Sequence, residues 1–329
     1  MSDWISGFPG YRQVLVSAKK FFGRLIQTGP VPQHVGIIMD GNRRFAKSHK
    51  IELKEGHNLG FESMASILEL LFESGVKCAT VYAFSIENFK RSSYEVEWLM
   101  DLAKSKLQQI SSHGDLCEEF GIKIRILGNI QMLPKDVRDI LKDTEKITEN
   151  NNRAVLNVCF PYTSRDEITN SIKLTVQQSI DNPTMIIDEE TLNSNLFTRD
   201  NPPLDLLIRT SGTFRLSDFL LWQCTDPNCA IIFSEKLWPE FTPWDMGKIL
   251  LNWSFNKYWY GHGNGELTTT KYISNTQNDI TDKIETLSGS GSTGYQQFLH
   301  HDVESGNDTS LKSEENDTLT SEDEEKLVK

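Results

Sequence analysis

The sequence predicts an α/β protein whose central sheet is mostly parallel and flanked by helices. Between residues 34 and 262, short apolar runs alternate with longer stretches of helical periodicity. Such alternation is typical of a parallel sheet covered by helices, whose strands are buried on both faces. Polar clusters directly follow several of the apolar runs, and open α/β sheets carry their chemistry where strands end and loops begin.

The strands and helices are predicted in order along the chain. Five runs are interpreted as buried strands: 35–39, 79–83, 122–127, 154–159 and 204–208. Helical periodicity is clearest in three stretches between them: 59–73, 93–110 and 134–148. We therefore expect one α/β domain over 34–262.

The chain ends in an acidic segment, 263–329, that is rich in Gly, Ser, Thr and Asn. This segment carries fourteen acidic and five basic residues, so it accounts for −9 of the net charge of −12. Its few apolar residues cannot bury enough surface to offset the entropy lost on ordering. We predict a disordered acidic tail beside a catalytic domain that is close to neutral.

Residues 1–33 form a lead-in that ends at Pro30-Val31-Pro32. Apolar residues recur in it at helical spacing, from Tyr11 to Ile26, with basic residues on the other side of the helix. That pattern is typical of a helix on a membrane surface. A helix packed against the domain or a partner fits equally well, so both interpretations stay open.

The composition excludes several classes of protein. No run is long and apolar enough for a membrane-spanning helix. The folded part lacks the basic excess of a nucleic-acid-binding protein, so no nucleic acid is expected as a partner. Five irregularly spaced cysteines indicate a reducing compartment, and Cys224 with Cys229 lacks the second pair that a zinc site requires.

The first polar cluster, Asp40 to Phe45, directly follows the first predicted strand. A carboxylate such as Asp40 is a ligand for Mg²⁺, and Gly41 allows the backbone to approach a ligand closely. A helix beginning after it would offer free N–H groups and the guanidinium groups of Arg43 and Arg44 to a phosphate. An ordinary Asp-Gly-Asn turn is the alternative.

Two further clusters follow later strands. Residues 84–91 contain hydroxyl, carboxamide and guanidinium groups, and residues 209–217 contain Arg209, Arg215 and Ser217. A buried guanidinium without an anion is unfavourable, and Arg209 directly follows a strongly apolar run. Each arginine alone could form a structural salt bridge. Together, five arginines and one obvious cation ligand indicate a substrate with several phosphates.

Three regions resemble the signatures of cis-prenyltransferases, the undecaprenyl and dehydrodolichyl diphosphate synthases: 34–47, 82–91 and 208–223, together with Glu55-Gly56-His57. The resemblance extends in order from about residue 34 to 260. The details are most similar to the catalytic subunits of fungal dehydrodolichyl diphosphate synthases. It implies the family's fold, with an apolar tunnel beside the sheet. It also implies Mg²⁺-dependent addition of isopentenyl diphosphate to farnesyl diphosphate, which gives long-chain polyprenyl diphosphate for dolichol synthesis and protein glycosylation.

The resemblance also implies roles for the matching residues. Asp40 would hold Mg²⁺ and is the expected catalytic residue, with Asn88 in the condensation step. The expected substrate-binding residues are Gly41, Asn42, Arg43, Arg44, Phe45, His57, Phe84, Ser85, Glu87, Phe89, Arg91, Arg209, Arg215 and Ser217. Among these, Phe45, Phe84 and Phe89 would line the tunnel entrance. The proton acceptor stays open between a diphosphate oxygen and a relay centred on Asn88.

Two departures from the family pattern matter for assembly and metal binding. Where many bacterial members carry an acidic ligand, this chain has Asn228-Cys229-Ala230, so no second metal ligand is assigned. The Arg-x-Gly ending of single-subunit members is also missing. We expect a homologous, catalytically inert subunit of the Nogo-B-receptor type to supply it. The resemblance further implies peripheral attachment to the cytosolic face of the endoplasmic reticulum membrane, with lipid droplets as a second location.

Three rival functions compete with this one. A strand-end phosphatase needs an acid two residues after Asp40, where Asn42 stands. A trans-prenyltransferase needs Asp-Asp-x-x-Asp motifs, which the 34–262 region lacks. A catalytically weak scaffold subunit of the same complex is the remaining alternative, although such subunits lose the Asp40 to Arg44 region that this chain retains.

Overall fold

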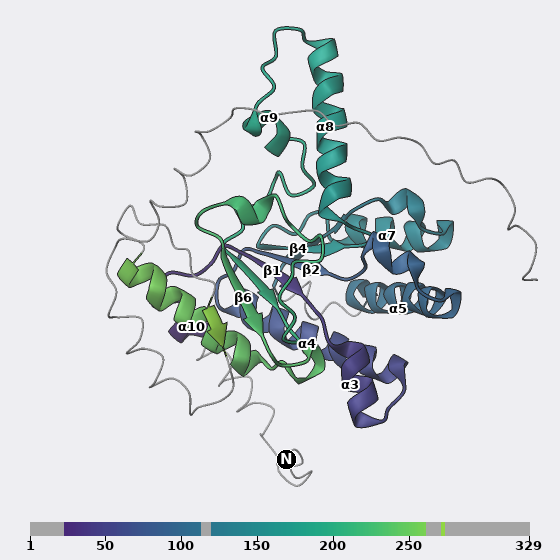
Figure 1. Cartoon of the computed structure of the whole chain (residues 1–329), viewed down its shortest axis with the longest axis vertical. Helices are drawn as coiled ribbons and strands as arrows, with labels where there is room; N and C mark the ends of the chain where they lie inside the picture. The colour runs from purple at the N-terminus through teal and green to yellow at the C-terminus, as the bar shows by residue number, and fades with distance from the viewer. Residues whose placement is uncertain (1–22, 113–119, 261–270, 274–329) are drawn as a thin grey trace, which may run out of the picture. The chain divides into compact units, whose positions relative to one another are not determined.

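The computed structural model describes residues 23–112, 120–260 and 271–273, which lie in the unit Met1–Asn275. In these residues seven parallel strands form one sheet in the order β3-β4-β2-β1-β5-β6-β7 (Figure 1). The strands are β1 His34–Ile38, β2 Cys78–Tyr82, β3 Ile122–Leu127, β4 Ala154–Cys159, β5 Leu206–Arg209, β6 Ala230–Ser234 and β7 Lys271–Ile273. The predicted α/β class with a parallel sheet is confirmed.

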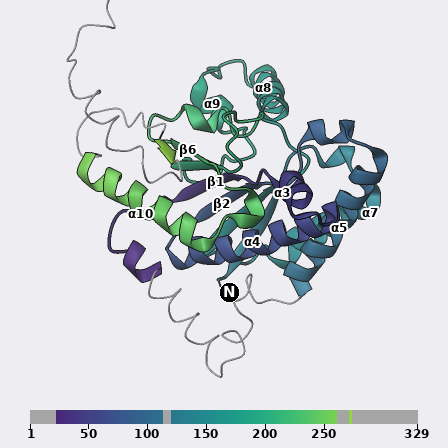
Figure 2. The same cartoon turned by 60° about the horizontal axis from the view of Figure 1, so that its bottom comes forward.

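Helices cover the sheet on both faces. They are α3 Asn42–His49, α4 Leu53–Glu73, α5 Ser93–Ser112, α7 Lys135–Ile147, α8 Ser164–Asp181, α9 Glu189–Asn193 and α10 Pro243–Tyr260. Four short 3-10 helices join them: η1 Ile86–Lys90, η2 Ile130–Met132, η3 Gln223–Thr225 and η4 Trp238–Glu240. Figure 2 shows α4 and α10 below the sheet and α8 and α9 above it.

The central strand β1 buries apolar side chains on both faces because each face packs against a different layer. Val35 and Ile37 of β1 belong to the large core shared with α4, α5, α7 and α10. Their neighbour Ile38 belongs to a smaller core on the other face, with Phe219 and Leu220. A strand that is buried on both faces favours a continuous apolar run, and residues 35–39 form such a run.

The order of the strands determines where a ligand can bind. The chain proceeds from β1 to β2 on one side, whereas β5 pairs with β1 on the other side. The loops after β1 and β5 therefore diverge, and the crevice between them lies at the carboxyl ends of the strands. In open α/β sheets this topological switch point is the usual ligand site.

The sequence predicted five of the strands and missed two. The observed ends of these five strands differ from the predicted ends by at most two residues, which is the usual uncertainty of a strand boundary. β6 and β7 were not expected, and β7 lies within the segment predicted as a disordered tail. Residues 263–270 and 274–329, the remainder of that tail, lie outside the described residues, as do 261 and 262 of the predicted catalytic domain.

Only the end of the lead-in segment, 23–33, is described. Ile26 is 1% exposed and packs in the large core, and Gln27 donates a hydrogen bond from Nε2 to the Glu73 carbonyl oxygen at 2.7 Å. The interpretation of a helix packed on the domain therefore holds for this end. Residues 1–22, which carry most of the amphipathic pattern, lie outside the described residues.

Two helices keep apolar side chains in solvent. On α10, Met246, Leu250 and Trp253 are buried, whereas Tyr258 and Trp259 are 59% and 64% exposed. On α8 four apolar residues are exposed, and three of them follow a four-residue spacing: Ile172, Val176 and Ile180, with Leu174 between them. Within the described residues no helix is both long and apolar enough to cross a membrane.

Candidate active site

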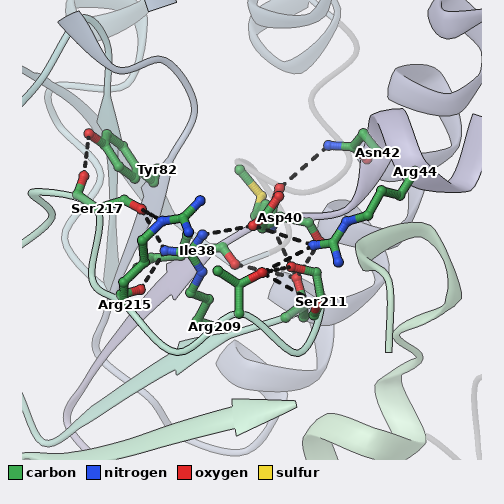
Figure 3. Close-up of polar contacts among 12 residues, drawn as sticks. Ile38, Asp40, Asn42, Arg44, Tyr82, Arg209, Ser211, Arg215 and Ser217 are labelled. Carbon is green, nitrogen blue, oxygen red and sulfur yellow. Dashed lines mark hydrogen bonds and ion pairs between the residues drawn. The ribbon is translucent and has the colours of Figure 1, made fainter. Parts of the chain in front are cut away.

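Asp40 and Arg209 meet at the switch point between β1 and β5. Arg209 is the last residue of β5 and Asp40 lies two residues beyond β1. Arg209 donates a hydrogen bond from Nη2 to Asp40 Oδ2 at 2.7 Å (Figure 3). Thr210 supports the loop, because its Oγ1 donates to the Asp40 carbonyl oxygen at 2.7 Å. The carboxylate and the guanidinium predicted from separate motifs therefore form one pair.

The Arg209 side chain is 3% exposed, so its orientation is determined by its partners. Its Nη1 donates to Ser217 Oγ at 2.6 Å and to the Arg215 carbonyl oxygen. Arg215 in turn donates from Nε to Ser217 Oγ at 3.3 Å. The Nε atom of Arg209 is buried without a partner. Three of the predicted substrate-binding residues, Arg209, Arg215 and Ser217, thus lie together (Figure 3).

Asp40 is held in its charged form. Burial alone would raise the pKa of this carboxyl group, but hydrogen bonds from Arg209 and Ser211 and the charges of Arg209 and Arg44 outweigh it. The net effect lowers the pKa of Asp40 below its usual value. At neutral pH the site therefore presents an ionised carboxylate among cationic groups.

The helix α3 begins directly after Asp40, as the sequence predicted. Gly41 has a φ of 119°, and a Cβ there would lie 3.0 Å from backbone atoms of Leu237 and Trp238, so only glycine fits. No side chain caps the first turn of α3, whose N–H groups stay available to an anion. Arg43 is exposed, and Arg44 lies 3.7 Å from Asp40 Oδ2. Asn42 packs against α4, and its Oδ1 is buried without a partner.

The second motif forms the short helix η1 at the end of β2. Ser85 and Asn88 cap this helix reciprocally: Asn88 Oδ1 accepts from the Ser85 N–H at 3.0 Å, and Ser85 Oγ accepts from the Glu87 N–H at 3.2 Å. Glu87 pairs with Lys90 and lies 3.8 Å from Arg165. Arg91 is bound by Glu95 at 2.8 Å, from the first turn of α5.

His57 is a neutral group at the cavity wall. Burial, reinforced by the charges of Arg91 and Arg43, lowers its pKa to about 4. Its ring centroid lies 5.3 Å from that of Trp98, and its Nε2 is buried without a partner. A neutral imidazole can donate or accept one hydrogen bond here, but it adds no positive charge for a phosphate.

These residues surround a cavity of about 700 Å³ that is polar at one end and apolar at the other. Of the predicted site residues, all line the cavity except Phe45 and Phe89. Phe45 stacks on His49 of its own helix, with ring centroids 4.0 Å apart. Phe89 packs on Phe84, with centroids 5.0 Å apart, so it supports the wall without reaching the cavity. Neither residue lines the cavity in this structure, and their expected role at the tunnel entrance stays a prediction.

The apolar end of the cavity comes from elements that the motifs did not identify. It is lined by Phe61 and Met64 of α4, Val81 of β2, Leu99, Leu102, Ala103 and Leu107 of α5, and Leu156, Val158 and Phe160 on or beside β4. Residues that line an apolar tunnel have the same spacing as residues of an ordinary core. The cavity therefore has the apolar lining expected of the tunnel, but the sequence alone did not distinguish these residues from an ordinary core.

Four polar or aromatic residues of the cavity were also missed. Trp238 is buried and donates from Nε1 to the Gly60 carbonyl oxygen at 2.7 Å. Arg165 donates from Nε to Asp218 Oδ2 at 2.7 Å. Lys106 reaches the cavity from α5. Only Asp218 was within a quoted motif, beside Ser217, and the other three required the tertiary structure.

Metal binding at this site would depend on Asp40. Among residues 23–112, 120–260 and 271–273, no three acidic, histidine or cysteine side chains gather as a metal cluster. Ala230 begins β6, at the end of the sheet away from Asp40, and Lys257 Nζ contacts Asn228 Oδ1 at 3.4 Å. Asn228 to Ala230 therefore lie away from Asp40, and the second metal ligand stays unassigned.

Comparison with known proteins identifies the family. The family model described as undecaprenyl diphosphate synthase matches residues 38–261. The chain belongs to this family, the cis-prenyltransferases. The crystal structure of lavandulyl diphosphate synthase from Lavandula x intermedia, in complex with dimethylallyl diphosphate, has a TM-score of 0.63 and 28% identity over 68% of this chain and 95% of that chain.

Two relatives belong to eukaryotic dehydrodolichyl diphosphate synthase complexes. A subunit from Schizosaccharomyces pombe is 44% identical over 255 residues, 77% of this chain and 96% of its own length. The human subunit is 43% identical over 241 residues, 72% of each chain. Both the family recognised from the motifs and the predicted class of enzyme, a polycis-polyprenyl diphosphate synthase, are confirmed.

Proposed function

We propose that this chain is the catalytic subunit that extends farnesyl diphosphate with isopentenyl diphosphate to a long-chain polyprenyl diphosphate. The observation that carries the proposal is the Asp40–Arg209 pair at the polar end of a cavity that continues into an apolar channel. A diphosphate needs cations, whereas an isoprenoid chain needs an apolar wall. One continuous cavity provides both.

The first diphosphate, that of the allylic substrate, would bind at α3. The uncapped N–H groups of α3 and the guanidinium group of Arg44 lie beside Asp40, and the exposed Arg43 lines the same cavity. Helix N-termini and arginines both stabilise phosphate oxygens. The isoprenoid tail would extend along α4, past His57 and toward Phe61.

The second diphosphate, that of isopentenyl diphosphate, would bind between the loops after β2 and β5. Arg209, Arg215 and Ser217 already contact one another, and Arg91 and Ser85 line the facing wall. The orphaned Nε of Arg209 offers one donor without breaking an existing bond. Each charge-assisted contact would contribute roughly 1.5–3 kcal/mol.

The site fits a magnesium ion shared with the substrate. Mg²⁺ in proteins is usually bound through one or two carboxylates plus substrate phosphates and water, and Asp40 is an ionised carboxylate at the required position. Asp40 would hold the ion, which when bound supplies positive charge to the diphosphate. The arginines would share that task during ionisation.

In the reaction a C–O bond and a C–H bond break, a C–C bond forms, and the C–H electron pair becomes the new double bond. The allylic C–O bond breaks, the electron pair leaves with diphosphate, and the double bond of isopentenyl diphosphate forms the new C–C bond. The proton released passes to a diphosphate oxygen or to a group near Asn88, whose Oδ1 is already bound to the Ser85 N–H. The chain would align the two substrates and stabilise the charge of the leaving diphosphate through its arginines.

We further propose a second, catalytically inert subunit that supplies the missing Arg-x-Gly contact. The relatives from Schizosaccharomyces pombe and human are both named as complex subunits. Two faces suit a partner: the exposed aromatic end of α10, which we favour from the sequence, and the stripe Ile172, Val176, Ile180 on α8. Co-purification of the partner with Tyr258→Asp on α10 and, separately, with Val176→Asp on α8 would distinguish the two faces. Loss of the partner from only one variant would identify the docking helix.

Attachment to the cytosolic face of the endoplasmic reticulum membrane is part of the same proposal. Its support is the amphipathic pattern of residues 1–26 and an isoprenoid product that partitions into lipid. Binding of the full chain and of a 1–22 deletion to anionic liposomes at several salt concentrations would test it. Equal binding by both proteins would reject the membrane role of this segment.

The deciding experiment is chromatography of products made from farnesyl diphosphate and labelled isopentenyl diphosphate with Mg²⁺. We expect labelled long-chain product from the chain co-expressed with its partner, far less from the chain alone, and none from Asp40→Ala. Equal product from the pair with and without Asp40 would instead support the scaffold function. Full activity of the lone chain would refute the partner requirement.

A further inference from the structure

The helix α3 carries a stripe of positive charge that begins in the cavity and continues out of it. Arg43 and Arg44 line the cavity, whereas Lys47 and Lys50 do not. Spacings of three and four residues place the four side chains beside one another on one face of the helix, and all four are exposed. From Arg43 to Lys50 the stripe extends ~10 Å along the helix.

No acidic residue of α3 balances this charge. The helix and its C-cap, residues 42–50, contain no Asp or Glu. Among the described residues, the ion pair between Arg44 and Asp40 at 3.7 Å is the only one that the stripe forms. The surface helix α7 also carries four basic residues, but four acidic residues are interspersed with them. Like charges three or four positions apart destabilise a helix, so α3 keeps an arrangement that an external anion would relieve.

The order of the cations along the stripe suits an anion that approaches from solvent. The two lysines are on the outside, where a strongly hydrated ammonium group on a flexible side chain attracts an anion without holding it in one orientation. The two arginines are on the inside, where a planar guanidinium group binds phosphate oxygens in a fixed geometry. Beyond them lies the uncapped first turn of α3, at the positive end of the helix dipole. Positive groups therefore continue without interruption from solvent into the cavity.

We propose that Lys47 and Lys50 form a capture surface, which draws the diphosphate of the allylic substrate from solvent toward Arg43 and Arg44. This inference rests on the proposed function, because it takes a prenyl diphosphate as the substrate. The two lysines act at a distance, since neither lines the cavity. Charges along the approach to a site raise the local concentration and the association rate of an oppositely charged substrate, and salt weakens this effect.

Substitutions of the two lysines change the charge without changing the cavity wall. Lys47→Gln with Lys50→Gln removes two charges, and Lys47→Glu with Lys50→Glu reverses them. Lys142→Gln with Lys146→Gln is the matched control, because both residues are exposed on α7 and neither lines the cavity. Farnesol is the matched control ligand, since it has the isoprenoid tail of farnesyl diphosphate but no charge.

The experiment measures kcat/KM for farnesyl diphosphate at two salt concentrations, with the chain co-expressed with its partner. Exposed charges act over ~30 Å at about 0.01 M salt and over ~3 Å at about 1 M. At low salt we expect the glutamine pair to lower kcat/KM by about threefold or more, and the glutamate pair to lower it further. At high salt both variants should equal the parent. The value of kcat should stay at that of the parent, and the α7 variant should match the parent in both parameters.

Calorimetric titration of the same complexes separates capture from a change in the cavity. At low salt inorganic diphosphate should bind more weakly to the glutamine pair than to the parent, whereas the affinity for farnesol should be the same. A loss of farnesol affinity equal to the loss of diphosphate affinity would mean that the substitutions act on the cavity, and would overturn the capture surface.

The kinetic outcomes distinguish the capture surface from the function on which it rests. Equal kcat/KM of the parent and both lysine variants at low salt would overturn the capture surface, as would the same loss at both salt concentrations or in the α7 variant. Failure of the parent complex to make any labelled product would overturn the proposed function. The titration with inorganic diphosphate would then still decide whether Lys47 and Lys50 attract this anion.

Discussion

Asp40 and Arg209 are bound side chain to side chain, Nη2 to Oδ2 at 2.7 Å, although 169 positions separate them in the sequence. The parallel pairing of β1 with β5 brings the two strand ends together. Each group holds the other in its charged form and in one orientation. The pair is therefore assembled before any substrate binds, which avoids reorganisation during ionisation of the diphosphate.

Replacement of Asp40 by alanine should abolish turnover of the complex without unfolding it. The side chain is partly exposed and contacts polar groups, so its loss leaves the apolar core unchanged. Steady-state rates should fall by about 10²–10³ or more, as when one preorganised electrostatic partner is removed. Circular dichroism and the unfolding midpoint check the fold. Activity above a few per cent in the folded variant would reject the role assigned to Asp40.

Arg209→Ala and Arg215→Ala should raise the KM for isopentenyl diphosphate, with some loss of kcat. Each change removes a charge-assisted contact, which corresponds to about ten- to a hundredfold in KM. Arg209→Ala should be the more severe, because it also leaves Asp40 and Ser217 without their shared partner. Initial rates at varied isopentenyl diphosphate provide the test. Unchanged kinetics in both variants would mean that the two arginines are structural.

The strand ends of this site were predictable from the sequence because apolar runs end abruptly in polar groups. Arg209 directly after Leu206-Leu207-Ile208 is such a signal, and Asp40 after β1 is another. The apolar end of the cavity was not predictable, since Phe61 and Met64 have the spacing of ordinary core residues. Whether a helical position faces a core or a cavity depends on the opposite helix, which local patterning does not encode.

The helix α8 and the strand β7 also depend on tertiary contacts that local sequence patterns do not encode. α8 buries Ser171 and Thr175 against α9 and exposes Ile172 and Ile180, the reverse of the usual amphipathic pattern. A prediction from hydrophobic periodicity would therefore place the apolar side of α8 against the domain, whereas the structure exposes that side to solvent. β7 is three residues long and lies in a polar segment, so its strand arises from pairing with β6 and not from its own composition.

Asp218 should act as a positioning residue for the loop that carries Arg215 and Ser217. Ser217 and Asp218 have φ values of 50° and 62°, which are unfavourable for residues other than glycine. The Asp218 carboxylate holds this conformation by accepting from the Arg165 N–H at 3.0 Å and from Arg165 Nε at 2.7 Å. The loop in turn places Ser217 Oγ against Arg209.

Asp218→Ala should therefore raise the KM for isopentenyl diphosphate several-fold. Asp218→Asn keeps an oxygen that can accept from the Arg165 N–H, so its KM should stay close to that of the parent. The KM for farnesyl diphosphate should change little in both variants, since α3 is untouched. A purely structural role would instead lower expression or stability without this difference between substrates. Equal kinetics of the alanine and asparagine variants would contradict the positioning role.

The stability of the chain should fall between about pH 6.5 and pH 4 because of His34. Burial lowers the pKa of this histidine from 6.5 to about 4, although its bond to the Pro202 carbonyl oxygen acts in the opposite direction. In that window the unfolded chain binds a proton that the folded chain does not. Unfolding is then favoured as pH falls, by up to about 1.4 kcal/mol per pH unit from His34, and His57, whose pKa burial also lowers to about 4, adds a similar contribution in the same window.

Urea unfolding of the chain at several pH values checks this prediction. His34→Gln supplies a control, because glutamine does not titrate yet can still bond to Pro202 or Thr80. The variant should be less stable at pH 7 but lose less free energy of unfolding on acidification than the parent. The same slope in both proteins would show that another group causes the acid sensitivity.

The last prediction concerns where the chain can be shortened. β7 pairs with β6 through Ile232 with Lys271 and Ser234 with Ile273, so a deletion of 264–329 removes a strand, whereas a deletion of 276–329 keeps it. Loss of a few backbone hydrogen bonds of about 0.5–1.5 kcal/mol each, and exposure of β6 as an edge, should lower the unfolding midpoint by a few degrees in the longer deletion.

Both shortened chains should keep their catalytic rates, because the site lies at β1 and β5 and not at the β7 edge. The longer deletion should also aggregate more readily on heating, since its new edge strand can pair with another chain. Differential scanning calorimetry and light scattering, run on each complex beside its activity assay, separate these effects. Equal midpoints for the two deletions would mean that β7 adds nothing to stability. A marked loss of rate in the 276–329 deletion would assign the acidic segment a role in catalysis.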